Sequence, residues 1–271
     1  MAKRKKKKKT VIIRLPIWKD YTFKEVFSDP EITKTFLESL LGVKLQELTY
    51  IHAEEEIRPD GKGRNIRQDI LAVDENGVVY DIEMQGENLD VIPYRYRANG
   101  SGLDSKLIKK GIKPSELKQI PKRYVIFICR KDPFGRGLKQ YTIYNTIHET
   151  GQKMEDKTEL ICLNASGTKG EVPVDIGAFL NYVKSGKDDG TNAFVHRIHR
   201  KVIELNQDKR FVRRGMTLEQ KMEDRYDAGL DKGIQGTVEI LREDGYSDSK
   251  ILERITGKYN LSKKQAEQYL R

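Results

Sequence analysis

Residues 67–85 read RQDILAVDENGVVYDIEMQ and predict a β-hairpin with acidic residues gathered at one end. Two apolar-rich strands flank a turn at residues 74–77 (DENG). Asp69 lies at the outer end of the first strand, and Glu83 and Gln85 lie at the outer end of the second. Carboxylates at one end of a hairpin can hold a divalent metal ion. A sheet with one solvated face would carry the same acids at little cost, so both interpretations stand at this point.

The length of the turn decides whether these acids meet. A two-residue loop at residues 76–77 would put Asp69 and Glu83 on opposite faces of the hairpin. A three-residue loop at residues 75–77 instead puts Asp69 directly opposite Glu83. That loop is a type I turn followed by a left-handed residue. It favours Asp or Asn before the loop and Gly at its end, as in DENG, so the sequence predicts the second register.

In this register the two faces of the hairpin differ in composition. A slip of one residue would scatter the acids among apolar neighbours, so burial selects the three-residue loop. One face then carries only apolar side chains, which are Ile70, Ala72, Val78, Tyr80, Ile82 and Met84. The other carries Leu71, Val73 and Val79 near the turn, and Asp69, Asp81, Glu83 and Gln85 away from it.

Length and composition bound the class of protein. At 271 residues the chain has room for one large domain and a small one. No apolar run approaches the ~20 residues that span a bilayer, and the basic N-terminus is not followed by a signal-peptide pattern. Cys129 and Cys162 lie in strand-like apolar runs, which predicts buried thiols in a reducing compartment. We therefore expect a cytoplasmic protein with no membrane partner.

The net charge of +10 is concentrated at the N-terminus. Lys3, Arg4 and residues 5–9 are all basic, so the rest of the chain carries only about +3 by the same count. Residues 1–10 are therefore predicted to be a disordered basic tail. Such a tail either adds salt-sensitive, sequence-independent attraction to nucleic acid or is a solvated segment without a specific role.

The order of elements predicts an α/β domain. We expect a helix over residues 20–41 with a break at Asp29-Pro30, because its apolar residues recur at helical spacing. A strand is expected over residues 47–57, and a helix over about 92–110 that ends at Gly111. Further strands are expected over residues 124–129, 141–144 and 159–163, the first of them buried on both faces. This order indicates a mixed sheet flanked by helices.

The C-terminal part of the chain is predicted to be helical throughout. We divide the chain into a core at residues 11–170, a helical extension of the core at 171–212, and a charged helical module at 213–271. The last part of that module predicts two helices with Ser247 and Ser262 as N-caps. This pair is either a packing or oligomerisation module or a helix-turn-helix DNA reader.

Several of these segments together resemble the PD-(D/E)XK nuclease-family transposases, a group that includes the recombination-promoting (Rpn) nucleases. The segments are DYTFKEVF at residues 20–27, the hairpin core at 69–85, PYRYR at 93–97 and the glycine-punctuated C-terminal region. The resemblance covers roughly residues 15–240. It implies a restriction-endonuclease-like mixed sheet flanked by helices, followed by a helical C-terminal extension.

The resemblance also implies a catalytic site. Asp69 matches the metal-binding aspartate of the family, and Glu83 matches the second acid. Gln85 stands where the broader superfamily carries lysine, although glutamine is usual in this branch. Asp20 and Lys24 match the helix pattern upstream of the hairpin, with Asp20 given no firm role. The family pattern also suggests a lysine a few residues before Asp69, and Arg64 is the candidate to replace it.

Phosphodiester hydrolysis explains why these residue types would occur together. A hard cation neutralises developing charge and lowers the pKa of the attacking water. Mg²⁺ takes one or two carboxylates, here Asp69 and Glu83, and Mn²⁺ is the alternative ion. Gln85 can orient water but adds no charge. The predicted phosphate contacts are Lys24, Arg64, Arg95 and Arg97, and the alternative for those on helices is ordinary solvated charge.

These observations favour a Mg²⁺-dependent DNA endonuclease, with DNA as partner, a homodimer as a further option, and no small-molecule cofactor. A second hypothesis is a non-catalytic DNA-binding or regulatory protein on a decayed nuclease core. The presence of Asp69 and Glu83 argues against decay, and the absence of the lysine expected a few residues before Asp69 favours it. A third hypothesis is a helical interaction protein whose function lies after residue 210.

Overall fold

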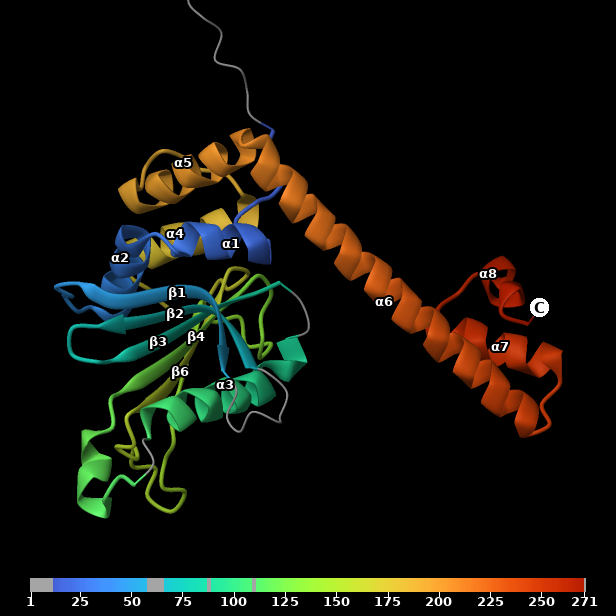
Figure 1. Ribbon diagram of the computed structural model, residues 1–271, viewed down its shortest axis with the longest axis horizontal. Coiled ribbons are helices and arrows are strands. Elements are labelled where there is room, and N and C mark those ends of the chain that lie inside the picture. The colour runs from blue at the N-terminus through green and yellow to red at the C-terminus, as the bar shows by residue number, and fades with distance from the viewer. Residues whose placement is uncertain (1–11, 58–65, 87–88, 109–110, 271) are drawn as a thin grey trace, which may run out of the picture. The chain divides into compact units, whose positions relative to one another are not determined.

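The computed structural model describes residues 12–57, 66–86, 89–108 and 111–270 of the chain. The chain divides into two compact units, Met1–Val212 and Arg213–Arg271. Figure 1 shows the elements of both units. The predicted phosphate contact Arg64 and the predicted basic tail lie outside the described residues.

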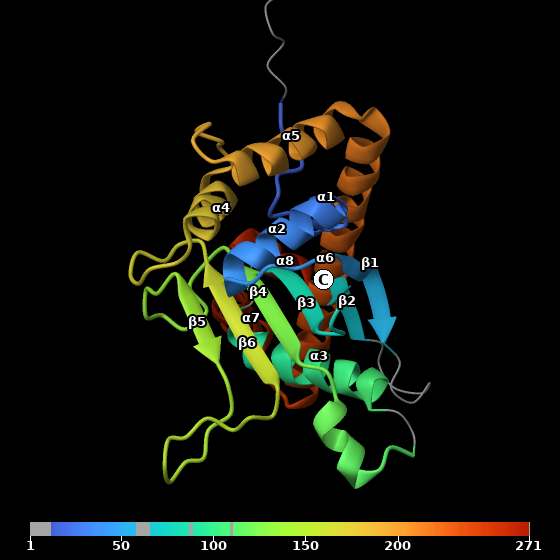
Figure 2. The same cartoon turned by 90° about the vertical axis from the view of Figure 1, so that its left-hand side faces the viewer.

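The first unit is built on a six-stranded mixed sheet in the order β1-β2-β3-β4-β6-β5. Figure 2 shows the strands side by side across the sheet. β1, β2 and β3 are antiparallel neighbours, β3, β4 and β6 run parallel, and β5 closes the far edge antiparallel to β6. The predicted mixed sheet is therefore confirmed. The strands are β1 (Leu48–Ile57), β2 (Ile66–Asp74), β3 (Val79–Gln85), β4 (Arg123–Cys129), β5 (Gln140–Ile143) and β6 (Thr158–Asn164).

The turn between β2 and β3 has the predicted three-residue loop. Val73 pairs with Val79 and Ile70 pairs with Ile82, which is the register expected from DENG. The Asp74 carboxylate accepts hydrogen bonds from the backbone N–H groups of Asn76 and Val78, each at 2.9 Å. Gly77 adopts a φ of +76°, a conformation that favours glycine. These bonds fix the loop and, through it, the register.

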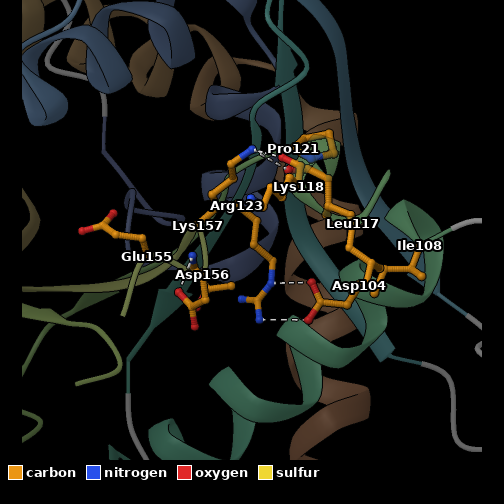
Figure 3. A pocket seen from close by; sticks show the side chains of 11 residues that line it. Asp104, Ile108, Leu117, Lys118, Pro121, Arg123, Glu155, Asp156 and Lys157 are labelled. Atoms are coloured by element: carbon orange, nitrogen blue, oxygen red, sulfur yellow. Dashed lines mark hydrogen bonds and ion pairs between the residues drawn. The ribbon is translucent and has the colours of Figure 1, made fainter. Parts of the chain in front are cut away.

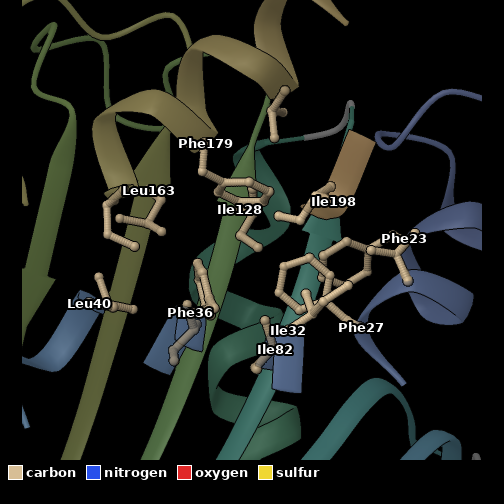
Figure 4. Packing of buried hydrophobic residues seen from close by; sticks show 14 of the residues in the cluster. Phe23, Phe27, Ile32, Phe36, Leu40, Ile82, Ile128, Leu163, Phe179 and Ile198 are labelled. Atoms are coloured by element: carbon tan, nitrogen blue, oxygen red, sulfur yellow. The ribbon is translucent and has the colours of Figure 1, made fainter. Parts of the chain in front are cut away.

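Four helices cover one face of the sheet and bury the larger core. They are α1 (Asp20–Phe27), α2 (Pro30–Leu41), α4 (Val174–Ser185) and α5 (Ala193–Gln207). Figure 4 shows aromatic and branched side chains of these helices packed on apolar residues of the central strands. The predicted break occurs between α1 and α2, where the Asp29 side chain caps α2 and Pro30 takes its first position. α2 ends at residue 41 as predicted, and Gly42 follows it in the left-handed region.

One helix, α3 (Ile92–Leu107), covers the opposite face of the sheet from α1 and α2 (Figure 1). Its Ile92 and Leu103 pack with apolar residues of β2, β3, β4 and β6 in a second, smaller core. Cys129 and Cys162 are buried in this core as free thiols. Two short 3₁₀ helices, Leu89–Val91 and Pro114–Gln119, flank α3 in the chain. Both faces of the hairpin are therefore covered by helices.

The second unit has a small core of its own. Its elements are the long helix α6 (Lys209–Glu243), which begins shortly before the unit boundary, α7 (Asp248–Tyr259) and α8 (Lys263–Gln268). Ile234, Val238, Ile251 and Ile255 are among the buried side chains of this core. Ser262 caps α8 through its hydroxyl, whereas Ser247 takes the N-cap position of α7 without a side-chain hydrogen bond to the helix backbone. No helix among the described residues is both long and apolar enough to cross a membrane.

Candidate active site

The outer end of the hairpin replaces main-chain pairing with carboxylate contacts. The ladder between β2 and β3 reaches Ile70 and Ile82. Beyond that pair, the Asp69 N–H donates to Glu83 Oε1 at 3.2 Å, and the Met84 N–H donates to Asp69 Oδ2 at 3.0 Å. The two acids that the sequence placed opposite each other therefore meet, and each is held by the other strand.

The acidic end of the hairpin is buried. Glu83 and Asp81 are 0% exposed, Asp69 is 7% exposed and Gln85 is 8% exposed. The interpretation of these acids as an ordinary solvated face is therefore wrong. Burying an ionised carboxylate is costly unless it is paired or hydrogen-bonded. Such a cluster needs cationic partners, which come from helices on both sides of the sheet.

Helix α1 supplies a lysine to Asp69. Lys24 is only 5% exposed, and its ammonium lies 3.2 Å from Asp69 Oδ1. The same ammonium donates to the Asp20 carboxylate, one helical turn earlier, at 2.7 Å. The residues of the upstream helix pattern are thus brought to the hairpin acids. A phosphate contact by Lys24 stays a prediction, and it would have to be made inside the site rather than on an open surface.

Helix α3 reaches Glu83 from the other face of the sheet. Arg95 donates through Nη2 to Glu83 Oε2 and through Nη1 to Gln85 Oε1. Its guanidinium also lies 5.5 Å from the centre of the Phe127 ring. Asn99, one helical turn after Arg95, donates to Glu83 Oε1 at 3.2 Å. Arg95 was predicted from the sequence as a phosphate contact, and here it is directed at the acids.

Asp81 and Asn99 belong to this cluster although the sequence reasoning gave neither a role. Asn99 donates to Asp81 Oδ2 at 2.9 Å and so joins this acid to Glu83. With both carboxyls ionised, Asp81 Oδ1 has no donor among the described residues, and a proton on Glu83 would provide one. Two signals could have identified them. Asp81 shares a hairpin face with Glu83, and Asn99 lies four residues after Arg95 on one helix face.

The carboxyls hold their protons unusually tightly. Burial raises the pKa of Glu83 to about 8, and the neighbouring Asp81 charge adds to this, while the Arg95 guanidinium opposes it. Burial also raises the pKa of Asp81 to about 7. Burial, followed by the charge of Glu83, raises the pKa of Asp69 well above its usual value. Perturbed groups of this kind are concentrated at functional sites.

The donor set fits a hydrated divalent cation rather than a closed protein cage. No group of three or more His, Cys, Asp or Glu side chains among the described residues is arranged to hold a metal ion. The available donors are the Asp69 and Glu83 carboxylates and the Gln85 amide oxygen, all hard oxygen ligands. Glu83 and Gln85 already hold a cationic group, the Arg95 guanidinium. Mg²⁺ commonly keeps several waters and takes only one or two carboxylates.

A cavity of about 560 Å³ lies at the other end of the parallel strands. Figure 3 shows Arg123 in its wall, with its guanidinium directed at Asp104. Arg123 is the first residue of β4, whereas Gln85 pairs with Cys129 at the end of that strand. The cavity therefore does not include the acids. Arg97, the remaining predicted phosphate contact, is exposed on α3, and its role stays a prediction.

The family relationship agrees with this geometry. Residues 17–171 match the family model described as PD-(D/E)XK nuclease family transposase. No curated protein and no solved structure matches the chain significantly. The matched region contains α1, the acidic hairpin and α3, and it extends through β6. Because this region covers more than half of the chain, the protein belongs to the PD-(D/E)XK nuclease-family transposases.

Proposed function

We propose that this protein is a Mg²⁺-dependent DNA endonuclease of the recombination-promoting type. The observation that carries the proposal is the burial of the Asp69 and Glu83 carboxyls at the outer end of the hairpin, where each accepts from a backbone N–H of the opposite strand. Burying such acids together away from water destabilises the fold unless cations, hydrogen bonds or protons compensate their charge. A divalent cation would supply compensating charge, with Mg²⁺ or Mn²⁺ as the ion.

The residues of the chain have separable roles in this proposal. Asp69 and Glu83 hold the cation, which when bound neutralises charge on the phosphate and lowers the pKa of the attacking water. The Met84 N–H and Lys24 orient Asp69, and Asn99 with the Asp69 N–H orients Glu83. Gln85 accepts from Arg95 through its oxygen, and its amide nitrogen can donate to water. Fixed donors and acceptors of this kind keep reacting groups in place.

DNA is the proposed substrate, and the break would promote recombination. Arg97 is the proposed contact to the phosphate backbone, because it is exposed on the helix that also supplies Arg95 and Asn99. A cytoplasmic location and a homodimer that cuts both strands accompany this proposal. The N-terminal basic residues would add affinity that weakens with salt.

A non-catalytic DNA-binding protein is the alternative, and one observation favours it. The broader superfamily carries lysine where this chain has the neutral Gln85, although glutamine is usual in this branch. The nearby Arg95 guanidinium is already engaged with Glu83 and Gln85. A decayed nuclease would bind DNA without cutting it. Retention of both acids, buried across the hairpin from each other, favours the nuclease instead.

The test is cleavage of supercoiled plasmid in Mg²⁺ by wild type and by the isosteric variants Asp69→Asn and Glu83→Gln. We expect nicking by wild type and its loss in both variants. Glu25→Gln is the matched control, because it removes one negative charge from an exposed position of α1 next to Lys24. Equal nicking by all four proteins would show contamination or a different site. Absence of nicking by wild type, with DNA binding retained, would support the non-catalytic alternative.

A further inference from the structure

Arg95 contacts oxygens of Glu83 and Gln85, two of the residues that would hold the proposed cation. Its two terminal nitrogens donate to Glu83 Oε2 and Gln85 Oε1. Resting on the proposed function, we propose that Arg95 is an internal counter-ion of the metal-free site, and that the divalent cation must displace it. Arg95 therefore lowers the affinity of the protein for metal.

The acceptor capacity of Glu83 leaves little room for a cation while Arg95 stays. Oε1 accepts from the Asp69 N–H and from Asn99, and Oε2 accepts from Arg95. The Glu83 side chain is 0% exposed, so water does not compensate its charge. Three of the roughly four acceptor positions of this carboxylate are therefore filled, and the remaining one is on Oε2, the oxygen that Arg95 contacts.

Of the three donors, the guanidinium is the one that can leave without disturbing the fold. The Asp69 N–H belongs to the backbone of β2, and Asn99 is 4% exposed and also donates to Asp81. The Arg95 side chain, in contrast, is 34% exposed and lies in the first turn of α3. Its long aliphatic stem allows the charged head to swing into water.

Charge repulsion prevents the Arg95 guanidinium and a divalent cation from contacting Glu83 at the same time. Like charges repel strongly where water is scarce, and a divalent ion on Glu83 would face the guanidinium at close range. In the absence of metal the same guanidinium offsets the desolvation of Glu83. Arg95 thus stabilises the metal-free protein and competes with metal, two effects that a merely structural arginine would not combine.

The test compares metal binding by wild type, Arg95→Met and Arg197→Met. Methionine keeps an unbranched stem but removes the charge. Arg197→Met is the matched control, because it makes the same change at an exposed position of another helix, α5. Titrations of Mg²⁺ and Mn²⁺ are followed by calorimetry in the absence of DNA. We expect Arg95→Met to bind metal about tenfold more tightly than wild type, corresponding to about 1.4 kcal/mol. Arg197→Met should stay within about twofold of wild type.

Thermal unfolding gives the second readout. Without metal, Arg95→Met should melt below wild type, and saturating metal should raise its melting temperature by more than it raises that of wild type. Arg95→Lys keeps a charge but cannot bridge both acceptors, so its metal-free melting temperature should lie between those of wild type and Arg95→Met. This variant replaces Arg95→Met in the test if the methionine variant fails to fold.

The outcomes separate this inference from the proposed function. If wild type binds metal and cleaves DNA while Arg95→Met binds metal equally or more weakly, the inference is wrong and the proposed function stands. If neither wild type nor the Arg95 variants bind metal, both are wrong. Tighter binding in Arg95→Met without cleavage by any protein supports the inference and favours the decayed nuclease.

Discussion

Buried charge lies at both ends of the parallel strands, and the two ends balance it differently. At the start of β4, Arg123 pairs with Asp104 at 2.7 Å, one cation to one anion. At the hairpin end, Lys24 pairs with Asp69 and Arg95 pairs with Glu83, whereas the third carboxyl, Asp81, accepts from the neutral Asn99. Balanced charge is what a structural ion pair needs. An excess of buried carboxyls marks the end where another cation or a proton is required.

The largest expected effect comes from removing an acid at the unbalanced end. Glu83→Gln and Asp69→Asn should each lower the rate of DNA cleavage at least about a hundredfold, because electrostatic contributions at reacting centres are typically of that size. Arg123→Met should leave the rate within about threefold. Initial rates of plasmid nicking in Mg²⁺ measure both. A similar loss of rate in Arg123→Met would mean that the two ends do not differ in the way the charge balance indicates.

The pH dependence of stability should also separate the two ends. Glu83 binds its proton more tightly in the folded than in the unfolded chain, since its folded pKa is about 8. The folded state then holds more protons between about pH 4.5 and 8, so the free energy of unfolding of the metal-free protein should fall as the pH rises through that range, by roughly 2–5 kcal/mol. Urea unfolding at several pH values measures this. Glu83→Gln should flatten the dependence, and Arg123→Met should not.

The balanced end should contribute stability without chemistry. Arg123→Met removes the partner of Asp104 and a guanidinium that packs against Gly100 of α3. Because the Asp104 side chain is 36% exposed, water can compensate much of its charge. We expect a loss of about 1–2 kcal/mol in the free energy of unfolding, measured by urea denaturation at pH 7. An unchanged free energy would show that this pair has no structural role.

The sequence predicted the register and the acids of the hairpin end but not the cations that pair with them. The turn residues DENG were enough for the hairpin register, because Asp74 and Gly77 determine the loop locally. The contact between Asp69 and Glu83 followed from that register. Their cationic partners come from elements about 45 residues before and 12 residues after them in the chain, and only packing decides how such side chains point.

Arg95 illustrates this limit. In the sequence it is one of several charged residues at a helix start, and a phosphate contact was the natural prediction. In the fold, α3 crosses the face of the sheet that carries Glu83 and Gln85, so the Arg95 guanidinium donates to these two side chains. The sequence did not indicate Asn99 for the same reason, because its role depends on hydrogen bonds to Asp81 and Glu83 of β3.

The smallest expected effect comes from bringing the charge balance of the hairpin end closer to that of the Arg123 end. Gln85→Lys adds a third cation beside three carboxyls and beside Arg95, which now donates to Gln85. The added charge should weaken Mg²⁺ binding by roughly threefold to tenfold, because a net negative site attracts the cation less once it is neutralised. Gln85→Met, of similar length and without charge, separates this effect from loss of the amide. Calorimetric titration measures both variants. Equal weakening in the two would mean that the amide oxygen of Gln85, rather than the charge balance, determines metal affinity.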